Sequence, residues 1–350
     1  MKQGILATIV LLMVFCLIGG CVTGGNPTNQ PSTESLIKDL QNTSNFDARW
    51  NAVQELGKTG DKNAVTPLIE TLNNDPDARF RMMAAESLGE IKNESAVEPL
   101  IEVLKNDTEA IDVRSAAATA LGRMGDTRAI APLIETLASP SSVFPGTAEN
   151  ALAMIGKPAV DPLIEALNGP SEGGAINTLG MIGDTRATEP LIAIMMKEQW
   201  IDIPKALGKI KDKRAVQPLV EQIPLLKTLN GVSLVELTYR KEVVNALGSI
   251  GPDAKDAVPA LLDLVQNPVE GGIAVSGSVP AGEIQSNPDS ITVQMYEGNM
   301  HVHLGSVIEA IDALGDIGDN RAVPVLNALA NSSDEDIQYH AKEALKKING

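Results

Sequence analysis

The sequence contains few aromatic side chains and almost no thiols. Phe, Trp and Tyr make up 3% of its 350 residues, and both cysteines, Cys16 and Cys21, lie near the N-terminus. No disulfide can therefore stabilise the rest of the chain. A composition dominated by Ala, Leu and Ile suits thin, closely stacked helices better than a sandwich or a barrel.

Positive charge is also scarce. The chain has 28 Lys and Arg residues against 45 Asp and Glu residues, so its formal net charge is −17. An acidic chain of this kind repels phosphate backbones, so we expect no nucleic-acid partner. The sequence also lacks a nucleophile elbow, a phosphate-binding glycine loop and zinc-ligand spacing. We therefore assign no catalytic residue and expect no cofactor.

One repeated unit organises the chain, and its clearest copy is 112–137. An apolar segment rich in alanine ends at Gly125, and Asp126 is placed to cap the next helical segment. Pro132 then suits the first turn of a second helix, whose apolar stripe is Leu133, Ile134 and Leu137. A single hairpin cannot bury both stripes, so stacked copies must share a continuous core.

Two short motifs show how many copies of the unit the chain contains. The Pro-Leu-Ile mark stands at Pro67, Pro99, Pro132, Pro162, Pro190 and Pro218, with variants at Pro259 and Pro324. The Leu-Gly mark keeps the same order. We therefore predict an all-α superhelix of about eight helical hairpins over 36–350, closed by a final helix over 334–348.

These strings resemble the HEAT-like repeat first named from phycobilisome bilin lyases. The resemblance is carried by Leu121-Gly122, by 125–130 and by 132–135, with copies at 183–186 and 318–323. It implies an α-solenoid of the HEAT/armadillo type that serves as a scaffold for protein–protein interaction. An enzyme or enzyme-accessory subunit resembling the bilin lyases is the alternative.

A second comparison within the HEAT repeats disfavours one enzyme. Deoxyhypusine hydroxylase holds two irons with His-Glu pairs on its helices. The three histidines of this chain are His301, His303 and His340, and none is followed by Glu. That resemblance therefore carries no iron site over to this chain.

The N-terminal segment precedes the repeats. An uncharged apolar run over 5–18 ends in small residues directly before Cys21, which resembles a lipoprotein signal with its lipobox. By this resemblance 1–21 is a signal peptide, Cys21 is lipidated, and the protein is exported and anchored to the outer face of the cell membrane. An uncleaved N-terminal anchor is the alternative. The segment 22–35, rich in Gly, Asn, Thr, Pro and Ser, predicts a flexible linker.

An acidic residue recurs on the predicted second helices. We expect a negative strip along the concave side of the superhelix, where it would bind a basic or extended segment of another protein. Its members are Glu70, Glu98, Glu102, Glu135, Asp161, Glu165, Glu189, Glu221 and Asp263. A surface that merely stays solvated is the plainer interpretation. The recurring Asp and Arg of the turns, such as Asp126 and Arg128, indicate a structural ladder.

The helical pattern is interrupted over 267–303. This insertion predicts a β-hairpin with a turn at 297–299, and long insertions in repeat proteins often carry function. His301 and His303 are two residues apart, so on a strand they would face the same side and could bind a metal with Glu297 or Glu309. A solvated pair of polar side chains is the alternative, and we assign no metal site.

Overall fold

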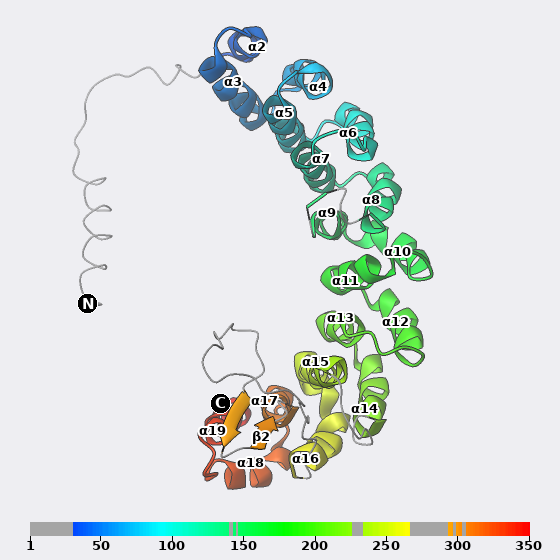
Figure 1. Cartoon of the computed structure of the whole chain (residues 1–350), viewed down its shortest axis with the longest axis vertical. Coiled ribbons are helices and arrows are strands. Elements are labelled where there is room, and N and C mark those ends of the chain that lie inside the picture. The colour runs from blue at the N-terminus through cyan, green and yellow to red at the C-terminus, as the bar shows by residue number, and fades with distance from the viewer. Residues whose placement is uncertain are drawn as a thin grey trace, which may run out of the picture.

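The computed structural model describes residues 31–139, 143–144, 146–225, 234–266, 293–296, 299–302 and 306–350 (Figure 1). The predicted signal peptide 1–21 lies outside the described residues, as do most of the predicted linker and most of the insertion. None of the helices in the described ranges is both long and apolar enough to span a membrane.

Eight helical hairpins follow one another along the chain, which confirms the predicted all-α superhelix. The first helices of the hairpins are α3 (Phe46–Thr59), α5 (Ala78–Ile91), α7 (Ile111–Met124), α9 (Thr147–Ile155), α11 (Glu172–Ile182), α13 (Asp202–Ile210), α15 (Leu234–Ile250) and α17 (Ser306–Ile317). The second helices are α4 (Val65–Asn74), α6 (Val97–Lys105), α8 (Ile130–Leu137), α10 (Val160–Ala166), α12 (Thr188–Met195), α14 (Val216–Leu225), α16 (Val258–Gln266) and α18 (Val323–Leu329).

The turn within each hairpin has the chemistry that the sequence predicts. Gly125 ends α7 with φ +70°, a left-handed conformation that glycine adopts without strain. The Asp126 carboxylate then accepts the backbone N–H of Arg128 at 2.9 Å. This bond caps a 3-10 turn that leads directly into α8, and Pro132 is the third residue of that helix.

Such a 3-10 turn joins the two helices of every hairpin. The turns are η1 (Lys62–Ala64), η2 (Glu94–Ala96), η3 (Thr127–Ala129), η4 (Lys157–Ala159), η5 (Thr185–Ala187), η6 (Lys213–Ala215), η7 (Gly251–Ala257) and η8 (Asn320–Ala322). Each contains an alanine that is fully buried at the base of the hairpin, Ala129 in η3 for example. The apolar residues of both helices form one continuous core along the row of hairpins.

The hairpins form an arc, with the first helices on its inner side and the second helices on its outer side (Figure 1). Small residues explain the direction of the curve. A Cβ placed on Gly89 would lie 2.7 Å from Cα of Ala120, and one placed on Gly122 would lie 2.6 Å from Cα of Ala151. The first helices therefore approach backbone to backbone and contact one another extensively, whereas successive second helices hardly touch. A row packed more closely on one side must curve toward that side.

Both ends of the row carry an additional helix. At the N-terminus α2 (Thr33–Gln41) packs on α3, and its first turn is capped by the Ser32 hydroxyl. The predicted linker 22–35 is therefore wrong in its last three residues, because Ser and Thr there start a helix. At the C-terminus α19 (Glu335–Asn349), capped by Asp334, packs on α17 at the position predicted for the final helix.

Within the insertion, two strands are described. The strands β1 (Val293–Tyr296) and β2 (Asn299–Val302) pair antiparallel, with Tyr296 opposite Asn299 and Gln294 opposite His301. The insertion enters the row between α16 and α17.

Candidate interaction surfaces

The nine predicted acidic residues are all exposed, and all lie on the second helices. They do not line the concave side. The second helices form the outer, convex side of the arc (Figure 1), so the predicted strip lies on the opposite face of the solenoid. The prediction assumed the usual placement of second helices, and it missed that the Gly–Ala contacts draw the first helices to the inside. The displaced residues are Glu70, Glu98, Glu102, Glu135, Asp161, Glu165, Glu189, Glu221 and Asp263.

Three of these acids belong to a ladder of arginines that ties successive hairpins together. Glu98 accepts from Nη1 of Arg128 at 3.2 Å, and Asp161 accepts from Nη1 of Arg186 at 2.8 Å. In the next hairpin, Glu189 lies 3.5 Å from Nη1 of Arg214. Each acid is on the hairpin before its arginine, so the ion pairs cross the joint between hairpins.

The same arginines make two further contacts. Arg186 holds the capping residue Asp184 through Nε and Nη2, and its Nη2 also donates to the carbonyl of Lys157 at 3.0 Å. Arg128, Arg214 and Arg321 repeat both contacts. This arginine ladder, formed by Arg128, Arg186, Arg214 and Arg321, confirms the structural role predicted for the Asp-x-Arg turns.

The ladder also sets the charge state of its aspartates. Hydrogen bonds from the Arg128 side chain and backbone lower the pKa of Asp126, and Asp184 and Asp212 behave alike. At the C-terminal rung, the Arg321 side chain lowers the pKa of Asp319 to about 2. The rungs are therefore ionised over the whole physiological pH range.

Five of the remaining six acids, all except Asp263, form a row that the ladder does not neutralise. Glu70, Glu102 and Glu165 make no ion pair with any described residue, and Glu221 accepts a hydrogen bond from Gln217 at 3.2 Å. Glu135 lies 3.3 Å from Nζ of Lys105 in an exposed pair, which contributes little. We call Glu70, Glu102, Glu135, Glu165 and Glu221 the outer acidic row.

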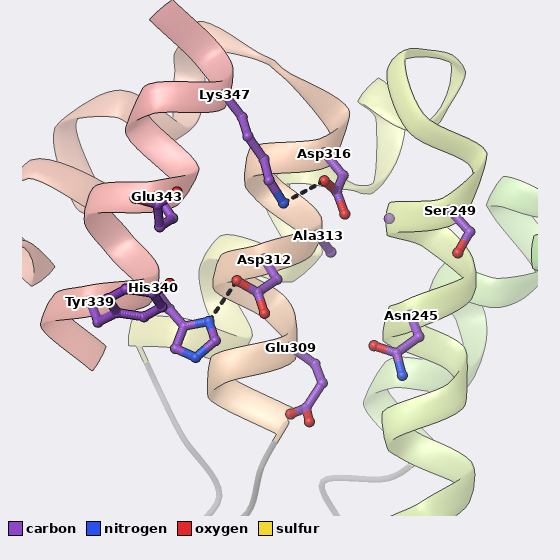
Figure 2. Close-up of a pocket in the computed structure, with 11 residues that line it drawn as sticks. Asn245, Ser249, Glu309, Asp312, Ala313, Asp316, Tyr339, His340, Glu343 and Lys347 are labelled. Atoms are coloured by element: carbon purple, nitrogen blue, oxygen red, sulfur yellow. Dashed lines mark hydrogen bonds and ion pairs between the residues drawn. The ribbon is translucent and has the colours of Figure 1, made fainter. Parts of the chain in front are cut away.

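A shallow pocket of about 610 Å³ opens on the other face, where α15, α17 and α19 stand side by side (Figure 2). One hydrogen bond and one ion pair join α19 to α17. Nδ1 of His340 lies 2.8 Å from Oδ1 of Asp312, and Nζ of Lys347 lies 2.8 Å from Oδ1 of Asp316. Figure 2 shows both pairs on the wall of the pocket.

The opposite wall is polar and uncharged, with Asn245 and Ser249 on α15. Glu309 lies at the base of α17 and pairs with Lys241 at 3.1 Å. Within the described residues no group of three or more His, Cys, Asp or Glu side chains could hold a metal ion. The pocket is therefore a polar depression whose charges largely satisfy one another.

Two of the four weak metal candidates lie outside the described residues, so the structure does not bring them together. His301 lies on β2, opposite Gln294, whereas His303 and Glu297 lie outside the described residues. Glu309, the other predicted ligand, is engaged with Lys241. Cys21, the predicted lipidation site, also lies outside the described residues.

Sequence reasoning missed the inner face. On most first helices a glycine, replaced by Ala153 on α9, packs on the next first helix, and the residue that follows this position is exposed on the inner face. These residues include Arg123, Met154, Met181 and Lys209. The repeat itself contained the signal, because residues next to a buried small-residue contact must point away from the core. Trp200 is an aromatic residue that could bind a partner if it were exposed. It is half-buried against the core, and its indole N–H donates to Oε2 of Glu198 at 2.7 Å.

This fold defines a class of protein, the α-solenoid built from helical hairpins. Family models assign HEAT repeats to residues 33–111 and 107–173, and the PBS lyase HEAT-like repeat to residues 307–332. The matched segments lie at both ends of the row, and in these segments the solenoid is similar to HEAT repeats. The comparison with curated proteins gives no match.

Several solved structures are similar over long segments. The CpcE–CpcF complex of phycocyanin lyase from Nostoc sp. PCC7120 is 22% identical, covering 70% of this chain and 100% of that one, with a TM-score of 0.36. Human deoxyhypusine hydroxylase is 19% identical, covering 91% and 96%, with a TM-score of 0.31. The Kap95:Nup1 complex is 12% identical, covering 97% of this chain and 48% of that one, with a TM-score of 0.48. No function can be assigned from similarities of this size.

Proposed function

We propose that the chain is an exported scaffold, attached to the outer face of a membrane by lipidated Cys21, that binds another protein along its outer acidic row. A solenoid of this length presents an extended surface, and HEAT-repeat solenoids generally bind other proteins. The anchor is supported by the apolar run over 5–18 and the small residues before Cys21. Two acyl chains on one cysteine would suffice for stable attachment.

The observation that carries the proposal is the regular, unneutralised negative charge of the outer row. Glu70, Glu102, Glu165 and Glu221 occupy the same position on four second helices, and all are exposed. Neighbouring helices in such packing lie roughly 8–10 Å apart. A partner segment with lysines or arginines spread along its length would meet one carboxylate of the row on each of α4, α6, α8, α10 and α14, steered by the field of the whole acidic chain. The equivalent position of α12 is Ala193.

The insertion 267–303 is a second contact in this proposal, because it emerges between α16 and α17, near one end of the row of second helices. Long insertions in repeat proteins are common sites of binding. Replacing it with a short Gly-Ser linker should weaken partner binding while leaving the solenoid folded, as measured by circular dichroism.

Charge reversal tests the outer row. Intact cells are crosslinked, the partners that copurify with the full chain are identified by mass spectrometry, and capture is repeated with the variant Glu102→Lys/Glu165→Lys. We expect capture of the partner to fall strongly. The matched control is Glu86→Lys/Glu90→Lys, which reverses two exposed carboxylates on α5 of the inner face. Equal capture by both variants would remove the acidic row from the proposal.

A separate experiment tests the anchor. Cys21→Ser should release the protein from the membrane fraction and change its electrophoretic mobility. Globomycin, which blocks cleavage before the lipidated cysteine, should change the mobility alone. A matched change at Cys16, inside the apolar run, should leave fractionation unaltered. Retention of the Cys21→Ser variant in the membrane would favour the uncleaved anchor.

A further inference from the structure

An arginine without a partner stands on the inner face of this acidic protein. All the arginines lie in the described part of the chain, and Arg123 is the one among them with no hydrogen bond or ion pair to a described residue. It is exposed at the end of α7. Lys205 and Lys209 of α13 are also exposed and make no ion pair with the described residues.

These cations belong to one line of side chains across four first helices. The glycine contacts fix the register of neighbouring helices, because a Cβ placed on Gly122 would lie 2.6 Å from Cα of Ala151 and one placed on Gly180 would lie 2.8 Å from Cα of Ala206. The residues that follow the glycine position are therefore in line. They are Arg123 on α7, Met154 on α9, Met181 on α11 and Lys209 on α13, and we call them the inner row.

The pocket of Figure 2 shows on which face of the solenoid the inner row lies. Ser249, Asp316 and Lys347 hold the same position on α15, α17 and α19, and all three line that pocket on one face of the three helices. That face is the side of the first helices away from the second helices, toward the inside of the arc (Figure 1). The inner row continues the same surface into the middle of the solenoid.

The centre of the inner row is apolar and unusually open. Met154 and Met181 are 53% and 41% exposed, although methionine is normally buried. The glycine contact is missing at this joint, since Ala153 stands at the glycine position and Thr178 at the alanine position. In keeping with these larger residues, α9 and α11 contact each other less than other neighbouring first helices do. Flexible methionine side chains at a widened joint adapt readily to an apolar ligand.

One turn earlier, the corresponding positions hold Asn150 and Asn177, so the helix ends around the two methionines carry no negative charge. Carboxylates do lie near the opposite end of α11. Glu172 is there, and burial together with the nearby charge of Glu198 raises its pKa. From Arg123 to Lys209 the inner row is thus cationic and apolar in a chain with a net charge of −17, and it is flanked on the α5 side by Glu90.

From this juxtaposition we propose that the inner row binds an acidic, amphipathic segment of another protein, whose carboxylates pair with Arg123, Lys205 and Lys209 and whose apolar side chains cover Met154 and Met181. A basic segment would be repelled by Arg123 at one end and by Lys205 and Lys209 at the other, and the nearest inner-face carboxylate of the neighbouring helix, Glu90 of α5, lies beyond the row. A flat lipid surface cannot enter the inside of an arc. The proposal concerns the face opposite the outer acidic row, so it extends the proposed function to a second, oppositely charged partner surface.

The geometry fixes the length of the occupant. Three steps of roughly 8–10 Å separate Arg123 from Lys209, which spans roughly 24–30 Å. At about 3.3 Å per residue, an extended segment of about eight or nine residues reaches from one end to the other. Its acidic residues belong at the two ends and its apolar residues in the middle.

Fluorescence anisotropy with defined peptides tests this proposal on the purified full chain. The probe is a labelled nine-residue peptide with Glu at both ends and two Leu in the middle. One matched peptide carries Lys in place of Glu, and a second carries Ser in place of Leu. We expect the acidic, apolar peptide to bind best and its affinity to decrease as salt is added.

Variants of the inner row then test whether the peptide binds there. Arg123→Glu/Lys205→Glu/Lys209→Glu should weaken binding of the acidic peptide by roughly tenfold or more, since three exposed ion pairs are lost. Met154→Gln/Met181→Gln should reduce the difference in affinity between the peptide with Leu in the middle and the peptide with Ser there. Lys213→Glu changes an exposed lysine of the η6 turn that does not belong to the inner row; it is the control and should have no effect.

Two results would overturn the proposal. One is a basic peptide that binds as well as the acidic peptide, and the other is an acidic peptide whose affinity is unchanged in the triple variant. Circular dichroism of each variant shows whether the solenoid is intact. The outer acidic row is unaltered in all of these variants, so failure here leaves the proposed function standing.

Discussion

Gly180 of α11 packs directly on the backbone of Ala206 in α13. A Cβ added to Gly180 would lie 2.8 Å from Cα of Ala206, closer than such atoms approach in folded proteins. The same relationship joins most pairs of neighbouring first helices, and it is the reason that the solenoid curves toward them. The first prediction rests on this contact.

Gly180→Ala should destabilise the protein although alanine favours helix. The helix propensity gains less than about 1 kcal/mol, whereas separating α11 from α13 costs about 1–3 kcal/mol. Gly173→Ala in the same helix is the matched control, because its Cβ would meet Trp200 at 3.8 Å, an ordinary contact. Urea denaturation followed by circular dichroism should show a lower midpoint for the first variant and an equal or higher midpoint for the second.

A buried ion pair near the N-terminus gives a second prediction. Arg49 and Asp75 pair with side chains that are 10% and 5% exposed, and Nε of Arg49 also donates to the carbonyl of Leu40 at 2.9 Å. Asp75→Ala leaves a buried arginine without its counter-charge, which costs about 3–5 kcal/mol. The fluorescence of Trp50 should report early unfolding of this end.

Asp107→Ala is the control for that experiment. Arg114 repeats the geometry of Arg49, with Nε on the carbonyl of Leu104 at 3.2 Å, but its partner Asp107 is 90% exposed. Arg114 is as buried as Arg49, but water reaches Asp107 and already screens this pair, so Asp107→Ala should lower stability less than Asp75→Ala does. If both aspartate variants unfolded alike, burial would not be the reason for the effect.

The arginine ladder gives a third prediction. Arg186→Lys should weaken the joint between the fourth and fifth hairpins nearly as much as Arg186→Gln. A lysine lacks the planar fork that reaches Asp184, Asp161 and the carbonyl of Lys157 together. Hydrogen exchange should become faster in α10 and α12 and stay unchanged in α5. If the amides of α10 and α12 stayed fully protected from exchange in Arg186→Lys, the positive charge alone would be sufficient to hold the joint.

The fourth prediction concerns pH. The Arg321 side chain lowers the pKa of Asp319 to about 2 from 3.8, so the carboxylate stabilises the folded state above about pH 4. This contribution is lost as the pH falls from about 4 to about 2, because the unfolded state binds the proton first. In Arg321→Gln the pKa should rise partway toward 3.8, since the backbone N–H of residue 321 still donates. Carboxyl carbon NMR titration of Asp319 measures both values, and an unchanged pKa would contradict the assigned cause.

The repeat made most of the fold predictable. The Pro-Leu-Ile and Leu-Gly marks located all eight hairpins and the final helix, because each mark performs a local task, starting one helix or ending another. The linker boundary failed by three residues because Ser32 acts as a cap, and a serine-rich segment suits a linker and a helix start equally well.

The candidate surfaces were harder to predict. Exposure of Glu70 or Glu165 follows from helical periodicity, but the side of the arc on which each lies depends on which row of helices packs more tightly. That difference arises from Gly89 against Ala120 and its equivalents, contacts between residues about thirty positions apart. The cross-joint pairs, such as Asp161 with Arg186, needed the same spatial information.

Each hairpin is held chiefly by the two beside it. An assembly of this kind has no inherent size. A duplicated or deleted copy of the roughly thirty-residue unit would lengthen or shorten the arc by one step, with a new glycine to meet the next alanine and a new arginine to reach back across the joint. Such chains can become longer or shorter over evolutionary time without a new arrangement of core side chains.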